Sequence, residues 1–299
     1  MLNLTEKRVL ALPPLLYLVV LFLVPTLIMI FIAFREPGSY GGVEPLLAHI
    51  NGHTTINMSL DSFRFALSSK FIWQLFFRSM IFSLITTACC LILGYPLALL
   101  VARTNAKYRD LLLLLVIIPF WSCFLIRVYA WMIILGPDSG VNHLINYIVQ
   151  FFGFPAVNLL YSSFAVVVCL VYINLPFMIL PLYANLEKHE DDLLEASRDL
   201  GATRLQSFWR ITLPLSMPGI LAGSALVFIP SIGMFVVPEL VGNNCSLMIG
   251  NLIKQQFLQT MNWPLGSVTS IIMTLAVLSI SLLVGYIASH TNGLKYANK

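Results

Sequence analysis

The chain has 299 residues, of which 59% are hydrophobic and only 10% are charged, and its net charge is +4 at neutral pH. A soluble domain carries about a quarter charged residues, so this chain has too few polar side chains to cover a core in water. The composition therefore excludes an ordinary soluble protein and predicts an integral membrane protein.

Six apolar segments are long enough to cross a bilayer, which takes about 20 helical residues. The first follows Lys7 and Arg8 but is too long for a signal peptide, so we expect it to be retained as a helix. The chain shows no soluble second domain and no convincing internal repeat. The sequence thus predicts one all-α membrane domain over residues 1–299, with spans at residues 9–34, 71–102, 111–135, 159–183, 215–238 and 267–288.

Basic residues predict the orientation of these spans, because they gather on the cytoplasmic side of a membrane. Under a six-span topology, most of them fall on one side, and only four lie in segments on the other side, namely Arg35, Arg64, Lys70 and Lys254. The richer side carries both termini and the loop at residues 185–214, which we therefore expect to be cytoplasmic. The outer segments are residues 35–70, 136–158 and 239–266, whose glycine, proline and polar clusters are typical of irregular structure.

The sequence contains no motif for catalysis or metal binding. The five histidines lack metal-ligand spacing, and the five cysteines indicate no disulfide framework. There is no glycine-rich phosphate-binding loop with its lysine, no nucleophile elbow and no dinucleotide-binding fingerprint. We expect no catalytic residue, no metal and no cofactor in this chain, so any ATP must be used by a partner.

The cytoplasmic loop has the pattern of two short helices. One face of a short helix is predicted by the spacing of Leu193, Ala196, Ser197 and Leu200, and Gly201 is placed to end that helix. Thr203 with Gln206 three residues later is a capping-box pattern, which predicts the start of a second helix. This pattern alone fits two interpretations equally well: a rigid unit that another protein moves, or an ordinary amphipathic connector.

The spacing Glu195-Ala196-Ser197-x-x-x-Gly201, followed after nine residues by Ile211-x-Leu213-Pro214, resembles the EAA loop of binding-protein-dependent ABC importer permeases. The resemblance implies a type I ABC importer permease architecture. It also implies that the loop forms a coupling helix, which docks in a groove of the ATPase subunit. The coupling residues it implies are Glu195, Ala196, Ser197, Gly201, Ile211, Leu213 and Pro214. Ser197 departs from the alanine that is usual there, but both side chains are small.

Further segments are similar to the permeases of spermidine/putrescine importers, namely residues 118–121, 125–131, 175–183 and 237–240. This resemblance implies polyamine import across a bacterial inner membrane. It also implies the partners: an ATPase dimer that holds ATP and magnesium, a second permease that is a paralogue, and a soluble binding protein, with membrane lipid around the chain and no nucleic acid. A related permease for a different small solute is the alternative within the same family.

A polyamine path needs aromatic faces for cation–π contacts and a few carboxylates. The candidates are Glu239, Asp138, Trp121, Tyr129, Trp131 and Tyr172. Each also has a plainer interpretation, since an acid in a loop is often solvated and membrane aromatics often serve as packing residues or interface anchors. Arg127 would repel a cationic solute, so we interpret it as structural.

Glycines and prolines mark the spans themselves. Gly219 and Gly223 form a small-xxx-small pair, which favours close helix packing. Prolines can kink a span or be tolerated in it, and they occur at Pro96, Pro119, Pro176, Pro181, Pro218 and Pro230.

Two other functional classes fit less well. A secondary transporter or channel would need acids at mid-membrane depth or inverted repeats with broken helices. A membrane enzyme or signalling anchor would need clustered polar catalytic groups or a soluble domain. The sequence offers neither set of features.

Overall fold

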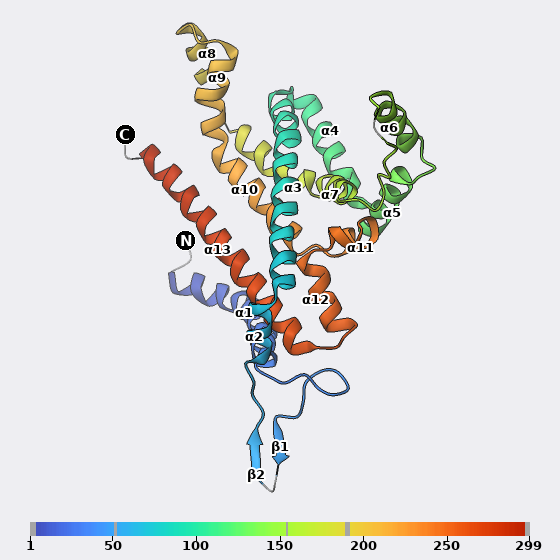
Figure 1. The fold of residues 1–299 in the computed structure, drawn as a ribbon. Coiled ribbons are helices and arrows are strands. Elements are labelled where there is room, and N and C mark those ends of the chain that lie inside the picture. The colour runs from blue at the N-terminus through green and yellow to red at the C-terminus, as the bar shows by residue number, and fades with distance from the viewer. Residues whose placement is uncertain (1–3, 51–52, 154, 189–191, 297–299) are drawn as a thin grey trace. The chain divides into compact units, whose positions relative to one another are not determined.

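The computed structural model describes residues 4–50, 53–153, 155–188 and 192–296, and its elements are labelled in Figure 1. These residues belong to two compact units. The first unit comprises Met1–Trp73 and Leu252–Ala276, and the second comprises Gln74–Asn251 and Val277–Lys299. The long helices α3 (Lys70–Arg103) and α13 (Trp263–Tyr296) each have residues in both units.

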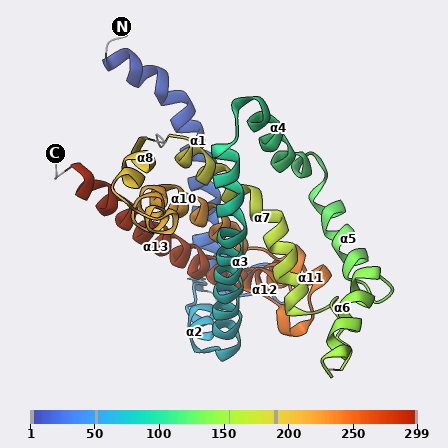
Figure 2. The same ribbon diagram turned by 90° about the horizontal axis from the view of Figure 1, so that it is seen from above.

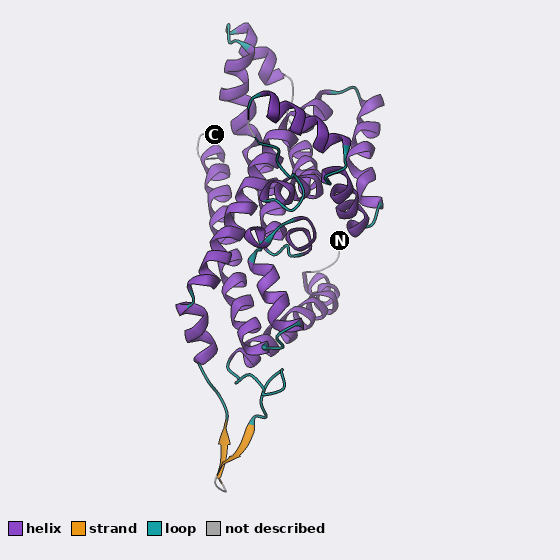
Figure 3. Ribbon diagram, turned by 45° about the vertical axis from the view of Figure 1, so that its right-hand side comes forward, coloured by secondary structure: helices purple, strands orange, loops and turns teal. Residues whose placement is uncertain are grey.

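Helices make up most of the described chain (Figure 3). In chain order they are α1 (Leu4–Ala33), α2 (Asp61–Ser68), α3 (Lys70–Arg103), α4 (Ala106–Ile117), η1 (Ile118–Trp121), α5 (Phe124–Leu135), α6 (Gly140–Phe151), α7 (Ser163–Leu186), α8 (Asp192–Asp199), α9 (Arg204–Ser207), the π-helix η2 (Phe208–Thr212), α10 (Leu213–Ile232), α11 (Val236–Val241), η3 (Asn244–Ser246), α12 (Ile249–Leu258) and α13 (Trp263–Tyr296).

A small β-hairpin is the exception to the predicted all-α class. Strand β1 (Leu47–Ile50) pairs antiparallel with β2 (His53–Ile56), with Leu47 opposite Ile56 and Ile50 opposite His53. The hairpin lies in the outer segment at residues 35–70, for which the sequence predicted irregular structure. The β-branched residues Ile50, Thr54, Thr55 and Ile56 suit extended backbone, which is a local reason for the strands.

Five helices of the described chain are long and apolar enough to cross a membrane, and a bent pair makes a sixth if it counts as one span. The long helices α1, α3, α7 and α13 contain most of the residues of the first, second, fourth and sixth predicted spans. The fifth predicted span, residues 215–238, is too long, because α10 ends at Ile232. Gly233 follows as its C-cap, and residues 236–241 form the separate helix α11.

The third predicted span is not one straight helix. Residues 107–121 and 124–135 meet at an angle of 92°, and the turn between α4 and α5 is visible in Figure 2. Pro119 has no N–H to continue the α-helical hydrogen bonds, and Ser122 and Cys123 have extended backbone. Of the six prolines named in the sequence analysis, the other five lie inside continuous helices, and Pro119 is the one that lies near a break.

Helices α7 and α10 pack closely in the second unit, and the glycine pair makes this possible. A Cβ atom added at Gly219 would lie 2.7 Å from Cβ of Asn185, and one added at Gly223 would lie 2.8 Å from Sδ of Met178. Both glycines are buried. The small-xxx-small pair therefore marks a helix–helix contact within this chain, where only hydrogen fits between the backbones.

Candidate functional site

The candidate site is the loop that follows α7. Just beyond the end of α7, the carboxylate of Glu187 accepts a hydrogen bond from Arg109 of α4 at 2.6 Å. The loop then forms two short helices, α8 and α9, which we call the α8–α9 unit (residues 192–207). Residues 189–191 of the loop lie outside the described residues. All seven predicted coupling residues fall in the unit, in the π-helix η2 after it or at the start of α10.

Gly201 ends α8 with a left-handed turn, as the sequence predicted. Its φ is +81°, a conformation that side-chain-bearing residues rarely adopt. Its N–H donates to the carbonyl of Arg198 at 2.8 Å, and the N–H of Ala202 donates to the carbonyl of Ser197 at 3.0 Å. This pair of bonds is a Schellman motif, which satisfies helix carbonyls that would otherwise lack partners. The glycine thus fixes the direction in which the chain leaves α8.

Thr203 begins α9 with the capping box that its sequence predicted. The Thr203 hydroxyl accepts from the N–H of Gln206 at 3.3 Å, and the Gln206 side chain accepts from the N–H of Thr203 at 2.9 Å. Two N–H groups at the helix start are satisfied reciprocally. The capping box therefore fixes the residue at which α9 begins.

A buried hydroxyl pair joins the two helices. Oγ of Ser197 lies 2.8 Å from Oγ of Ser207, and both side chains are at least nine-tenths buried. An alanine at residue 197 could not make this hydrogen bond. The unusual serine therefore has a local partner, and the contact holds α8 and α9 together as one unit.

The outward surface of the α8–α9 unit and its junction is partly apolar. Leu200 is 89% exposed, Leu205 is 68% exposed and Trp209 is 60% exposed. Glu195 and Ala196 are also exposed on α8. Exposed large apolar side chains beside a charged residue are characteristic of a surface that another protein covers.

The junction between α9 and α10 is a π-helix, and Pro214 gives a physical reason for it. A proline at residue 214 has no N–H to donate to the carbonyl of Arg210, four residues earlier. The N–H of Leu213 donates to the carbonyl of Phe208, five residues earlier, which widens the turn. Residues 204–232 nevertheless form one uninterrupted helical stretch. Of the residues carried over from the motif, Ile211 thus lies in this widened turn, and Leu213 and Pro214 begin α10 directly after it.

Gly201→Ala is expected to destabilise the turn by about 1–2 kcal/mol, the usual cost of left-handed backbone for an L-residue. A Cβ at Gly201 would meet nothing within 4 Å, so the cost comes from the backbone alone. Hydrogen exchange of the α8 amides should therefore become faster in Gly201→Ala and less so in Gly201→Asn, because asparagine tolerates this conformation better. Gly140→Ala is the matched control, since its Cβ also meets nothing. Equal exchange in all variants would contradict the turn described.

The predicted substrate-path residues do not form one cluster. Two of them are in contact: the rings of Trp131 and Tyr172 lie 5.5 Å apart at 66°. Both pack against the buried core of α5, α7 and α11, so their role in the isolated chain is packing. The remaining four have exposed side chains on separate elements: Trp121 in η1, Tyr129 in α5, Asp138 between α5 and α6, and Glu239 in α11.

Arg127, which we interpreted as structural, contacts an aromatic ring of the neighbouring short helix. Its guanidinium carbon lies 5.1 Å from the centre of the Phe120 ring, a cation–π distance. The contact joins α5 to η1 beside the bend of the third span. The guanidinium thus packs over a ring of the same chain, in keeping with a packing role.

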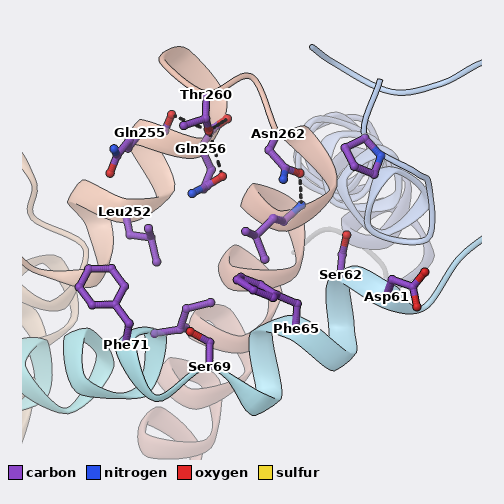
Figure 4. A pocket seen from close by; sticks show the side chains of 13 residues that line it. Asp61, Ser62, Phe65, Ser69, Phe71, Leu252, Gln255, Gln256, Thr260 and Asn262 are labelled. Atoms are coloured by element: carbon purple, nitrogen blue, oxygen red, sulfur yellow. Dashed lines mark hydrogen bonds between the residues drawn. The ribbon is translucent and has the colours of Figure 1, made fainter. Parts of the chain in front are cut away.

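A cleft in the first unit was missed by the sequence analysis. It has a volume of about 670 Å³ and lies among α2, the start of α3, α12 and the turn before α13. Phe65, Leu252 and Gln256 line it, and Figure 4 shows how its side chains lie. At its edge, the Thr260 hydroxyl donates to Oε1 of Gln256 at 3.0 Å. Its lining comes from two stretches far apart in sequence, residues 37–72 and 252–265, which is why no local pattern pointed to it.

Comparison with known proteins places the chain among transport subunits. Residues 94–292 match the family described as "Binding-protein-dependent transport system inner membrane component". The spermidine/putrescine transport system permease protein PotB of Escherichia coli is 45% identical over 217 residues, which cover 73% of this chain and 78% of the relative. PotB of Haemophilus influenzae is 46% identical over 203 residues, covering 67% and 70%.

Solved structures show the same fold. A chain from the crystal structure of a bacterial ABC transporter for the acidic polysaccharide alginate has a TM-score of 0.65 at 20% identity, covering 95% of this chain and 96% of that one. A chain of the MetNI methionine ABC transporter has a TM-score of 0.55 at 20% identity, covering 75% and 99%. The predicted ABC importer permease fold is thereby confirmed. The chain belongs to the family of binding-protein-dependent transport system inner membrane components.

Proposed function

We propose that this chain is a permease subunit of an ATP-driven importer that carries polyamines, spermidine or putrescine, across the inner membrane. The observation that carries this proposal is the 45% identity to PotB of Escherichia coli over 73% of the chain. That relative is named for spermidine and putrescine transport. The seven motif residues in and beside the α8–α9 unit support the ATP-driven class independently of the solute.

In this proposal the chain catalyses no reaction and holds no cofactor. ATP and magnesium bind to a separate ATPase dimer, and the α8–α9 unit docks on that ATPase through Leu200, Leu205 and Trp209. The termini and the unit lie in the cytoplasm, in keeping with their basic residues. A paralogous second permease completes the passage, and a soluble binding protein delivers the solute to the outer segments.

The solute path in this proposal uses side chains that the chain leaves exposed. Trp121 and Tyr129 offer ring faces to an alkylammonium group, and Asp138 and Glu239 offer carboxylates. Trp131 and Tyr172 are already engaged with each other and with the core. In this proposal, Trp131 and Tyr172 shape the wall of the solute path, and the four exposed side chains contact the polyamine.

The test is uptake of radiolabelled spermidine and putrescine by cells that lack their own polyamine import and receive the complete operon. We expect uptake with the unaltered chain. Uptake should fall at least tenfold with either Glu195→Lys or Gly201→Val. The first variant reverses a charge on the exposed surface of α8. The second places a β-branched residue at positive φ, where it is strongly disfavoured. Asp110→Lys is the matched control, because it makes the same charge reversal on the exposed surface of α4.

Three outcomes would contradict parts of the proposal. Uptake of another solute without any polyamine would remove the cargo and keep the importer. Unaltered uptake by both loop variants, at equal protein in the membrane, would remove the coupling role of the loop. Uptake that persists without the ATPase subunit would indicate a secondary transporter.

A further inference from the structure

One side chain of α3 contacts the first residue of the π-helical junction and the first turn of α10 after it. The ring of Tyr95 packs edge-on against the ring of Phe208, the first residue of η2, with centroids 5.7 Å apart at 89°. The Tyr95 hydroxyl lies 3.0 Å from the hydroxyl of Ser216, in the first turn of α10. Tyr95 is 92% buried and Ser216 is fully buried. Tyr95 therefore contacts the chain at the start of the π-helix and again just after its end.

Hydrogen bonds link side chains and backbone at this junction. The Ser216 hydroxyl lies 2.9 Å from the carbonyl oxygen of Leu213, to which it can donate. Either hydroxyl of the Tyr95–Ser216 pair can be the donor in the bond between them. The N–H of Leu213 donates to the carbonyl of Phe208, whose ring rests on Tyr95. Side chain, backbone and ring contacts thus form a closed loop around the π-turn.

We infer that Tyr95 is a positioning residue for energy coupling, which holds the π-helical junction at a fixed angle. A π-turn is less regular than an α-turn and often marks a functional position in a helix. With Tyr95 in place, a displacement of the α8–α9 unit passes into α10 and α3 together. Without it, bending of the junction absorbs the displacement. The inference rests on the proposed coupling role of the unit but does not depend on which solute is carried.

The first test measures the junction itself. In the complete complex in lipid nanodiscs, hydrogen exchange of the amides at residues 208–213 should become roughly fivefold faster in Tyr95→Phe, the usual worth of one buried hydrogen bond. Ser216→Ala removes the same bond from the other side and should give a similar increase. Tyr147→Phe is the matched control, because Tyr147 is an exposed tyrosine in α6. Amides in the middle of α7 should exchange as before.

The second test measures coupling. In proteoliposomes with the binding protein and its solute, Tyr95→Phe should lower the amount of solute taken up per ATP hydrolysed, and Tyr95→Leu, which also removes the ring contact, should lower it further. A purely structural defect would reduce uptake and ATP hydrolysis in the same proportion.

The outcomes separate this inference from the proposed function. Faster exchange together with a lower uptake-to-ATP ratio supports it. Unchanged exchange in both Tyr95→Phe and Ser216→Ala, or a ratio that stays at the wild-type value in Tyr95→Leu, overturns it. If the unaltered complex carries no polyamine, the polyamine proposal fails, while the exchange experiment still decides whether Tyr95 holds the junction.

Discussion

Gly219→Ala is expected to lower the free energy of unfolding by about 1–3 kcal/mol, the usual cost of overpacking a tight contact. The added Cβ would lie 2.7 Å from Cβ of Asn185 and 3.2 Å from the carbonyl oxygen of Pro181. Neither atom can move unless the backbone of α7 moves with it. Gly219→Leu should prevent the chain from accumulating in the membrane. Thermal unfolding in detergent and the amount of membrane-inserted protein measure these effects.

Two matched variants test the cause of this loss. Gly223→Ala should be milder, because its closest contact is the flexible side chain of Met178. Gly285→Ala in α13 should leave stability unchanged or slightly higher, since its Cβ would meet nothing within 4 Å and alanine is the better helix former. A Gly219→Ala chain as stable as the wild type would show that α7 and α10 do not pack as described.

A charge on the apolar surface of the α8–α9 unit is expected to abolish transport. Leu200→Asp or Leu205→Asp places an unpaired carboxylate where the ATPase is proposed to cover apolar side chains. Central interface residues of this kind are worth about 2 kcal/mol or more, which is roughly a thirtyfold loss of affinity. Co-purification of the ATPase subunit and solute uptake should both fall, while the chain itself remains in the membrane because neither leucine is buried.

The control for this prediction is Leu258→Asp at the end of α12. Leu258 is also an exposed leucine, but it lies in an outer segment by the charge pattern of the chain. The ATPase should remain bound to this variant. Wild-type affinity for the ATPase in both Leu200→Asp and Leu205→Asp would place the docking surface elsewhere on the chain.

The local structure of the α8–α9 unit was predictable because each of its signals acts over a few residues. Gly201 and the Thr203–Gln206 capping box depend on neighbours within one helical turn, and both appear where the sequence predicted them. The exposure of the helix faces was harder to predict. Ser197 is buried against Ser207 of the next helix, whereas Leu193 and Leu200 on the same predicted face are exposed.

Contacts between distant segments were the main features that sequence patterns missed. Tyr95 and Ser216 are 121 residues apart, and no periodicity links them. The sequence did contain one indication of this contact. A hydroxyl within an apolar span needs a hydrogen-bond partner, so the presence of Tyr95 predicts that such a partner exists. Likewise, six prolines looked equivalent in the sequence. The break occurs at Ser122 and Cys123, just after the short helix that contains Pro119, so a proline in the sequence does not by itself mark it.

The bend of the third span restricts what can surround this chain in a bilayer. Ser122 and Cys123, at the bend, are exposed and lie outside any helix. Hydrocarbon offers no hydrogen-bonding groups, so irregular backbone at membrane depth is tolerated only against protein or water. At the membrane depth that the predicted third span gives the bend, lipid could not cover this face of the chain. We therefore expect the bend to face another subunit or a hydrated passage, with the exposed ring of Trp121 beside it.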